Sequence, residues 1–249
     1  MRLAVIPARY GSSRFPGKPL ADLAGQPLIQ RVYTAVVATE LVDRVVVATD
    51  DERIARVVRA FGGEAVMTAP DHPSGTDRVA EAAAAYPEAE LVINVQGDEP
   101  FVRRDDLALL LEAFDDPTTA ISTLATPIRT ERRLFDPNVV KVVCGAAGEA
   151  LYFSRHALPY LRDVPLGQWI QQQKHLQHIG VYGFRADVLH TVTRLPPAVL
   201  EQQEALEQLR WLSAGYRIRV GITQHEAIGV DTPEDLVAAA SRYSDARIG

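Results

Sequence analysis

The stretch RVVVATDDERIARVVRAFGG, residues 44–63, contains the pattern that decides the fold. Its first part, Arg44–Thr49, is a run of apolar and β-branched residues that predicts a buried strand. Asp50 or Asp51 can then cap a helix whose apolar residues recur on one face, and a pair of glycines ends that helix. A strand followed directly by a helix is the repeating unit of an α/β sheet with parallel strands.

Further strands and helices of the same kind flank this stretch. Strands are expected at residues 3–7, 64–68 and 91–95, and a helix at residues 27–38, where Pro27 occupies the favoured first turn. The predicted fold class is therefore α/β, with a mostly parallel sheet flanked by helices. Ligands of such sheets bind at the carboxyl ends of the strands, so functional residues are expected in the turns that follow them.

The alternation of strands and helices weakens within residues 117–185. Strand-like runs continue at residues 119–125, 139–144, Ala150–Ser154 and 179–184, but no regular helix separates each pair. This pattern predicts a mixed or antiparallel insertion, or a face used for oligomerisation.

The last quarter of the chain returns to a regular alternation. A helix is expected at residues 202–214, a strand at residues 217–222, and a final helix that begins at Pro233 with Thr232 as its N-cap. No repeat, low-complexity segment or flexible linker interrupts the sequence. We therefore expect residues 1–249 to form a single domain.

Composition excludes several classes of protein. With 26 Lys and Arg against 32 Asp and Glu, the net charge of −6 lacks the basic excess of a nucleic-acid-binding protein. The single cysteine, Cys144, excludes an internal disulfide and a multi-thiolate metal site. The longest uncharged stretch, residues 117–128, is too short to span a bilayer. We expect a soluble, cytoplasmic protein with neither nucleic acid nor membrane as partner.

The loop after the first strand, residues 7–20, is rich in cations and small residues. Its sequence is PARYGSSRFPGKPL, in which Arg9, Arg14 and Lys18 can neutralise a polyphosphate while the glycines let backbone amides approach it. It is not a Walker loop, because the glycine spacing is one residue too long and Pro19 replaces the Ser or Thr. A phosphate-binding loop and a solvated basic loop both remain open.

Acidic residues follow two other strands. Asp98 and Glu99 come directly after the strand at residues 91–95, and Asp231 stands at a strand-to-helix junction. Each is also what a helix start requires, so capping is the alternative explanation. If the turns converge, the two aspartates can share one Mg²⁺ opposite the basic loop. That arrangement suits nucleotidyl transfer, in which positioning and charge neutralisation supply most of the catalysis.

Nine motifs, in order and with compatible spacing, relate the whole chain to one family. They are IPARYGSSRFPGKPL (6–20), VATDDERIA (47–55), HPSGTDR (72–78), INVQGDEP (93–100), NVVKVV (138–143), LYFSR (151–155), HIGVYGFR (178–185), LEQLR (206–210) and GVDTPEDL (229–236). On these motifs the chain resembles the 3-deoxy-manno-octulosonate cytidylyltransferases, also called CMP-Kdo synthetases.

The resemblance implies a fold and a reaction. The fold is a nucleotidyltransferase-type, Rossmann-like sheet whose segment 117–185 serves dimerisation and sugar binding, and the assembly is a homodimer. The substrates are CTP and Kdo (3-deoxy-D-manno-octulosonate), and the products are CMP-Kdo, used for lipopolysaccharide biosynthesis, and pyrophosphate. Mg²⁺ is the implied cofactor.

The resemblance also implies roles for individual residues. The nucleotide-binding residues are Ala8, Arg9, Gly11, Ser12, Arg14, Lys18, Gly75, Thr76 and Arg78. The catalytic residues are Arg14, Lys18 and two aspartates that also bind the metal, Asp98 and Asp231. The sugar-binding residues are Gln96, His178, Tyr182, Glu207 and Gln208.

Three other functions compete with this one. The first is the same chemistry on 8-amino-Kdo or a sialic acid. The second is a glycosyltransferase that consumes a nucleotide sugar at a carboxylate-bound metal. The third is a module that binds CTP without turnover, against which the presence of Lys18, Asp98 and Asp231 together argues.

Overall fold

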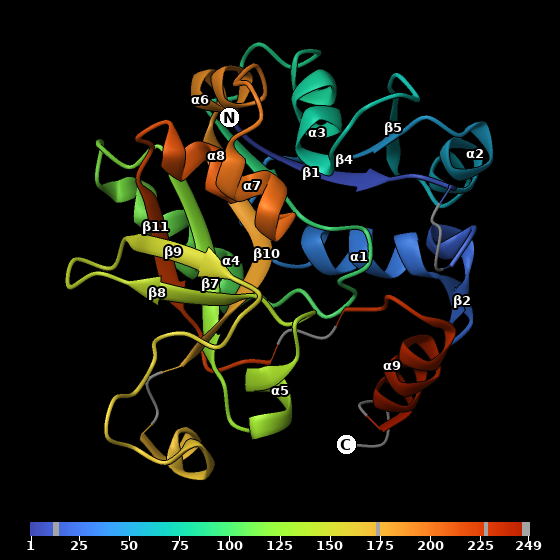
Figure 1. The fold of residues 1–249 in the computed structure, drawn as a ribbon. Coiled ribbons are helices and arrows are strands. Elements are labelled where there is room, and N and C mark those ends of the chain that lie inside the picture. The colour runs from blue at the N-terminus through green and yellow to red at the C-terminus, as the bar shows by residue number, and fades with distance from the viewer. Residues whose placement is uncertain (12–14, 173–174, 227–228, 246–249) are drawn as a thin grey trace. The chain divides into compact units, whose positions relative to one another are not determined.

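The computed structural model describes residues 1–11, 15–172, 175–226 and 229–245 (Figure 1). The chain divides into two compact units, of which the first comprises Met1–Leu107 with Ala227–Gly249 and the second Ala108–Glu226. The mixed segment expected at residues 117–185 falls within the second unit. Single-domain organisation stays a prediction from the sequence.

Four parallel strands form the sheet of the first unit. The strand β1 (Arg2–Ala8) pairs with β6 (Leu91–Asn94) and with β4 (Arg44–Thr49), and β4 pairs with β5 (Glu64–Met67). The side chains of β4 are buried from Val45 onwards, as its apolar sequence predicts. All four strands therefore end at the same edge of this sheet.

The helices of the first unit begin where side chains can cap them. Asp51 accepts a hydrogen bond from the amide of Arg53 at 2.9 Å and caps α2 (Glu52–Ala60), as expected. Ser74 caps α3 (Gly75–Ala83), a helix that the sequence pattern did not predict. The other elements of this unit are η1 (Lys18–Leu20), β2 (Asp22–Leu23), β3 (Gln26–Pro27), α1 (Leu28–Val37) and α9 (Pro233–Asp245), and α4 (Arg104–Glu112) contains the boundary between the units.

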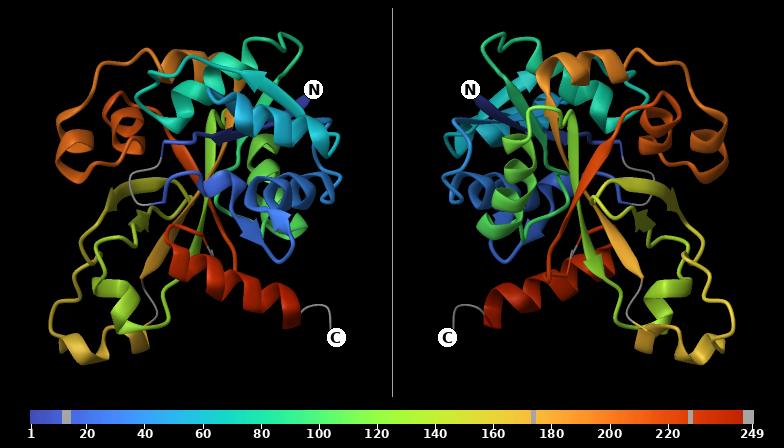
Figure 2. Two further views of the ribbon diagram at one scale, coloured as in Figure 1. Left: turned by 90° about the vertical axis from the view of Figure 1, so that its right-hand side faces the viewer. Right: turned by 90° about the vertical axis from the view of Figure 1, so that its left-hand side faces the viewer.

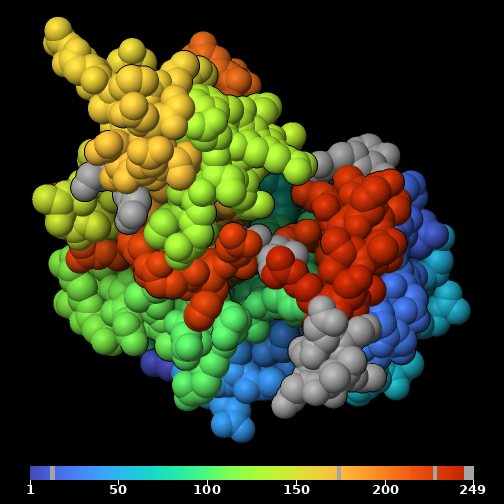
Figure 3. All heavy atoms as spheres, turned by 90° about the horizontal axis from the view of Figure 1, so that it is seen from below, coloured from blue at the N-terminus to red at the C-terminus, as the bar shows by residue number. Residues whose placement is uncertain are grey.

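The C-terminal helix α9 packs against the N-terminal part of the first unit. Figure 2 shows α9 (red) against β2, and in the space-filling view it lies at the surface beside blue N-terminal residues (Figure 3). Val230 and Ala239 are fully buried together with Leu23 and Leu28. As predicted, Thr232 caps this helix by accepting from the amide of Asp235 at 3.2 Å.

The second unit contains a mixed set of strands, as expected. The strand β10 (Leu176–Arg185) is antiparallel to β7 (Ile121–Pro127) and to β8 (Lys141–Cys144). The strand β11 (Ile218–Ile222) is parallel to β7, and β9 (Ala150–Ser154) is antiparallel to β8. A bulge interrupts the register of β10 against β7 between Ile179 and Tyr182.

The helix predicted at residues 202–214 is wrong as a single element. Two short helices, α7 (Val199–Glu204) and α8 (Gln208–Ser213), occupy this segment, and Ala205 between them has a left-handed backbone with φ of +49°. The reason is tertiary, because the carbonyl groups of Glu204 and Ala205 accept hydrogen bonds from the Arg155 guanidinium. The remaining helices of this unit are η2 (Ala113–Asp115), α5 (Glu131–Phe135), η3 (Leu166–Gln168), η4 (Ile170–Gln172) and α6 (Ala186–Val192).

Two further findings concern the apolar residues. Large buried side chains of the second unit include Trp211, Phe153 and Phe184, which lie on α8, β9 and β10. Among the residues that the structure describes, no helix combines the length and hydrophobicity needed to cross a membrane.

Candidate active site

A pocket of about 270 Å³ opens at the edge of the first unit where its parallel strands end. Its lining comes from the end of β1, the first residues after β6, the segment leading into α3, and the turn before α9. The predicted residues that line it are Ala8, Arg9, Lys18, Gly75, Arg78, Gln96, Asp98 and Asp231. The turns that carry these residues therefore meet at one edge of the sheet, where ligands of α/β proteins bind.

A close backbone contact fixes the turn after β6 against the end of β1. A Cβ atom on Gly97 would lie 2.8 Å from the Pro7 carbonyl oxygen, so a larger residue cannot occupy this position without moving the backbone. The neighbouring Gln96 donates a hydrogen bond to Asn94 Oδ1 at 3.1 Å. These contacts fix the backbone of the turn, so Gln96 and Asp98 line the pocket at defined positions.

Lys18 joins the two aspartates that the sequence placed on separate turns. Its Nζ atom lies 2.5 Å from Asp98 Oδ2 and 3.3 Å from Asp231 Oδ1. The turns themselves are linked, because the amide of Val230 donates to the Asp98 carbonyl at 2.9 Å. The Lys18 side chain is 14% exposed, against 29% for Asp98 and 52% for Asp231, so solvent screens the Asp98 contact less.

Negative charge is concentrated around this lysine. The pKa of Glu99 is raised to about 8 by burial and by the charges of Asp98, Asp106 and Asp231. Burial is the larger cause, and the negative charges of the three aspartates, which add to it, favour a cation nearby.

The loop that carries Lys18 is also held by contacts with residues other than the aspartates. Gly17 adopts φ of +72° and donates its amide to the Tyr10 carbonyl at 2.9 Å. The Tyr10 ring lies under the Arg53 guanidinium, 3.4 Å from Cζ to the ring centre, and Asp51 pairs with Arg53. The VATDDERIA motif thus supports the basic loop. Gly11 is exposed, whereas Ser12 and Arg14 lie outside the described residues.

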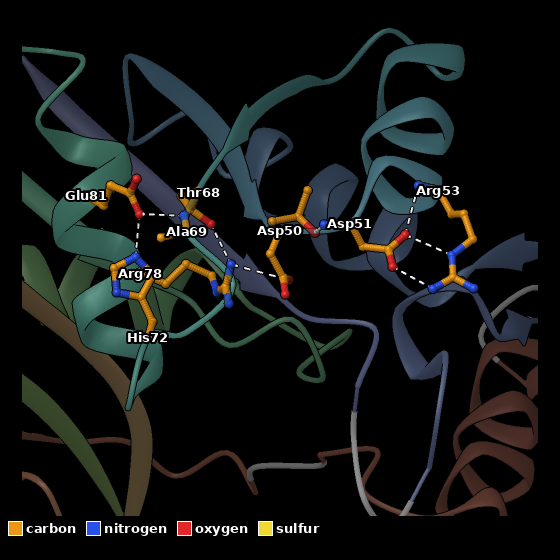
Figure 4. Close-up of polar contacts among 9 residues, drawn as sticks. Asp50, Asp51, Arg53, Thr68, Ala69, His72, Arg78 and Glu81 are labelled. Atoms are coloured by element: carbon orange, nitrogen blue, oxygen red, sulfur yellow. Dashed lines mark hydrogen bonds and ion pairs between the residues drawn. The ribbon is translucent and has the colours of Figure 1, made fainter.

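Arg78 reaches the pocket from α3 with its guanidinium buried. The side chain is 5% exposed, and Nη1 lies 3.3 Å from Asp50 Oδ1 and 2.5 Å from Thr68 Oγ1 (Figure 4). An arginine fixed in this way presents a donor group of defined direction. Thr76, on the same helix, is buried and does not line the pocket.

His72, which the sequence did not assign to the site, also lines the pocket. Its Nε2 atom contacts Glu81 Oε2, and this contact lowers the pKa of Glu81 (Figure 4). Glu81 also accepts from the amide of Ala69 at 2.9 Å, so the segment before α3 is attached to α3 itself. The signal was present in the HPSGTDR motif, whose first residues received no role. The other unassigned lining residues are Pro7, Pro19, Pro73, Ser74 and Gly97.

His178 lies in β10 of the second unit, next to the bulge. Its Nε2 atom lies 3.0 Å from the hydroxyl of Thr123, which is 2.8 Å from the Val181 carbonyl. If Nε2–H donates to Thr123 and Thr123 donates to Val181, all three groups are satisfied, and Nδ1 is left as an acceptor. Burial lowers the pKa of His178 to about 3, so the ring is neutral at physiological pH.

Tyr182 presents a buried hydroxyl without a hydrogen-bond partner among the residues that the structure describes. Its ring packs on Trp211 and His178, and burial together with the charge of Glu207 raises its pKa well above the usual value. A buried hydroxyl of this kind is costly unless a ligand or water completes it. Glu207 and Gln208, the other two predicted sugar-binding residues of the second unit, stand at the start of α8.

The carboxylates of the pocket fit a divalent cation of the Mg²⁺ type. No group of three or more His, Cys, Asp or Glu side chains close enough to hold a metal occurs in the described part of the chain. Mg²⁺ requires fewer, because it is typically held by one or two carboxylates plus substrate phosphates. The Lys18 ammonium already shows that Asp98 and Asp231 attract positive charge to one point.

The parallel strands, their helices and the charged pocket at the strand ends define an α/β protein of nucleotidyltransferase type. The family model for cytidylyltransferases matches residues 3–218. Two relatives are named 3-deoxy-manno-octulosonate cytidylyltransferase. The one from Porphyromonas gingivalis is 52% identical over 241 residues, which are 95% of this chain and 94% of the relative. The one from Parabacteroides distasonis is 49% identical over 242 residues, which are 95% of this chain and 96% of the relative. The chain therefore belongs to the cytidylyltransferase family, and within it to the 3-deoxy-manno-octulosonate cytidylyltransferases.

Solved structures agree with this assignment. The structure of CMP:2-keto-3-deoxy-manno-octonic acid synthetase complexed with CTP is 43% identical, with a TM-score of 0.91, and the match covers 98% of this chain and 99% of that chain. A 4-diphosphocytidyl-2C-methyl-D-erythritol synthase from Anaerococcus prevotii matches 98% of each chain with a TM-score of 0.63 at 14% identity, a likeness of fold alone.

The contact at Gly97 leads to the first prediction. Gly97→Ala should lower the free energy of unfolding by about 1–3 kcal/mol and weaken CTP binding, because the new methyl group forces the Asp98 turn away from β1. Urea unfolding and calorimetric titration with CTP measure the two effects. Gly167→Ala is the matched control, since its added Cβ would meet nothing closer than 3.7 Å. Wild-type stability and CTP affinity in Gly97→Ala would contradict the steric argument.

The lowered pKa of His178 predicts how stability depends on pH. The folded state keeps His178 neutral down to about pH 3, whereas an unfolded histidine takes up a proton below about pH 6.5. This group therefore costs the protein stability as pH falls from 6.5 towards 3, by at most about 1.4 kcal/mol per pH unit. In His178→Gln that contribution is absent. As the pH falls, the free energy of unfolding of the wild type should therefore decrease more than that of the variant. Urea unfolding at several pH values measures the gap, and parallel pH curves would contradict the assignment.

Proposed function

We propose that the chain is a cytidylyltransferase that activates Kdo with CTP, giving CMP-Kdo for lipopolysaccharide biosynthesis and pyrophosphate. The observation that carries this proposal is the meeting of Lys18, Asp98 and Asp231 at one point of the pocket. The names and near full-length identity of the relatives support the choice of CTP and Kdo.

The pocket supplies charges of both signs for a metal-bound triphosphate. Arg9, Lys18 and Arg78 are its cations among the described lining residues, and Arg14 is expected to join them. Once another cation compensates the two aspartates, the Lys18 ammonium can turn from carboxylate to phosphate. Gly75 and Arg78 at the start of α3, with Ala8 at the end of β1, are the residues we assign to the nucleoside.

The reaction is an in-line displacement at the α-phosphorus. The 2-hydroxyl oxygen of Kdo forms the new bond to phosphorus and releases its proton to solvent. The bond from the α-phosphorus to the bridging oxygen breaks, and pyrophosphate leaves with that oxygen. Lys18 stabilises the charge on the phosphates, and Asp98 and Asp231 would hold Mg²⁺, which supplies further charge neutralisation when bound. Positioning and electrostatics are sufficient for this step, so no covalent enzyme intermediate is proposed.

Sugar binding requires neutral donors and acceptors more than charge. In the second unit, neutral His178 and the Tyr182 hydroxyl, which has no hydrogen-bond partner among the described residues, offer such groups to a polyhydroxylated acid, and the Glu207 carboxylate adds an acceptor. Gln208 completes the proposed set in this unit. A homodimer formed through the segment 117–185 and a cytoplasmic location are further proposals that rest on the family resemblance.

Pyrophosphate release is the experiment that tests this function. With Mg²⁺, CTP and Kdo we expect turnover, and with ATP, GTP or UTP in place of CTP we expect much less. The same assay with 8-amino-Kdo and a sialic acid compares the sugar acids. Release of pyrophosphate with one of these sugar acids but not with Kdo would show that Kdo is not the substrate. Hydrolysis of a nucleotide sugar without pyrophosphate release from CTP would favour a glycosyltransferase. Binding of CTP without turnover would favour a sensing module.

The two aspartates give a further prediction. Asp98→Asn or Asp231→Asn should lower kcat about 100-fold or more while the fold stays intact, because each removes a charge that the phosphoryl transfer depends on. Pyrophosphate release and circular dichroism measure the two properties. Asp105→Asn, an exposed acid in the first turn of α4, serves as the control. Near-normal turnover in either pocket variant would remove that aspartate from the proposed metal site.

A further inference from the structure

A polar network around one buried lysine in the second unit has no place in the proposed chemistry so far. It is formed by Lys141, Arg155 and Glu204, which come from β8, the end of β9 and the end of α7. We propose that Glu204, held by this network, is a positioning residue that fixes the turn at Ala205 and thereby the sugar-binding residues that follow it. This inference rests on the proposed function, since it concerns the binding of Kdo.

Glu204 connects α7 to the end of β9 through both carboxylate oxygens. Its Oε1 atom accepts from Ser154 Oγ at 2.6 Å, and its Oε2 atom accepts from the amide of Arg155 at 2.9 Å. The carboxylate also contacts the Tyr152 hydroxyl and contributes to raising the pKa of that tyrosine. Removing the carboxylate would leave a buried hydroxyl and a backbone amide without their acceptor.

Arg155 completes the attachment by binding the backbone of the turn. Its Nε atom donates to the Glu204 carbonyl at 2.7 Å and its Nη2 atom donates to the Ala205 carbonyl at 3.2 Å. A third bond, from Nη1 to the Pro137 carbonyl at 3.1 Å, fixes the guanidinium from the other side. The carbonyl groups at the end of α7 are therefore directed to Arg155, so the helix does not continue.

Lys141 supports the same strand end from inside the protein. Its side chain is fully buried, and its Nζ atom donates to the carbonyls of Asp136 at 2.9 Å, Val139 at 2.6 Å and Arg155. A buried ammonium with three carbonyl acceptors is satisfied only in this arrangement, because each lost acceptor leaves charge uncompensated. The backbone of Arg155 is thus fixed from both its amide and its carbonyl.

The turn held by these contacts leads directly into the proposed sugar site. Ala205 adopts φ of +49°, which a residue with a Cβ atom rarely does without outside support. Leu206 is buried next to it, and Glu207 and Gln208 follow at the start of α8. In the straight helix that the sequence predicts, residues 207 and 208 would point in other directions, so the turn sets where their side chains lie.

A comparison of three variants tests this role. Glu204→Ala should raise the KM for Kdo about tenfold and leave the KM for CTP near the wild-type value, because a small displacement of binding residues is costly. Glu204→Gln, which keeps one carbonyl acceptor, should restore part of the loss. Ser122→Ala is the matched control, because it also removes a buried hydrogen bond of the second unit. The Ser122 hydroxyl donates to the Leu110 carbonyl at 2.9 Å, and Ser122 lies on the face of β7 opposite Thr123. This variant should leave both KM values unchanged.

Hydrogen exchange provides a second readout that does not depend on catalysis. The amides of Leu209 and Arg210 donate to the carbonyls of Leu206 at 3.2 Å and Glu207 at 2.9 Å in the first turn of α8. In Glu204→Ala they should exchange faster than in wild type, and in Ser122→Ala they should not.

The two readouts separate failure of the inference from failure of the proposed function. Suppose that the wild type releases pyrophosphate from CTP with Kdo. If Glu204→Ala then raises neither the KM for Kdo nor the exchange rates of these amides, compared with Ser122→Ala, the positioning role is wrong. An equal rise of both KM values would also overturn it, since that indicates general destabilisation. If wild type does not use Kdo, the proposed function fails, and unchanged exchange in Glu204→Ala still overturns the structural part of the inference.

Discussion

The contact of Lys18 with two carboxylates is the interaction on which the pocket depends. Asp98 and Asp231 carry like charges on turns that are bound to each other, and without a cation between them they would repel. Lys18 supplies that cation in the described structure, and a metal-bound nucleotide would supply it during the proposed reaction. In the proposed function, the negative charges that Lys18 neutralises would prepare the pocket for a metal-bound triphosphate.

The pocket also requires that residues far apart in the sequence lie close together, and α9 contributes to this. The Tyr243 hydroxyl donates to the Pro100 carbonyl at 2.8 Å, its ring stacks on Phe101, and Arg31 lies over the same ring at 4.6 Å. These contacts attach the helix that follows Asp231 to the turn that carries Asp98. Burial of Val230 beside Leu23 and Leu28 adds an apolar contact to the same attachment.

Whether the sequence predicts a structural feature depends on how far apart in the chain the interacting residues are. The strand Arg44–Thr49 and the cap at Asp51 are local, and the sequence predicts both. The helix α3 was missed because Gly75, Thr76 and Asp77 are poor helix formers in its first turn, so only the Ser74 cap signals it. The break at Ala205 could not be predicted, because Arg155 causes it from 50 residues away. Lys141 was missed for a similar reason, since its carbonyl partners lie in loops.

The two units carry different kinds of polar chemistry, and the difference follows the proposed substrates. The pocket of the first unit has charged groups of both signs, which a polyanion and its counter-cation require. The proposed sugar-binding residues of the second unit include a histidine kept neutral by burial and a tyrosine kept protonated by burial and by Glu207. Neutral groups of fixed direction distinguish one pattern of hydroxyls from another, whereas charges would attract any anion. Burial around Tyr182 and His178 would therefore serve selection of the sugar, and the charged residues Lys18, Asp98 and Asp231 would serve phosphoryl transfer.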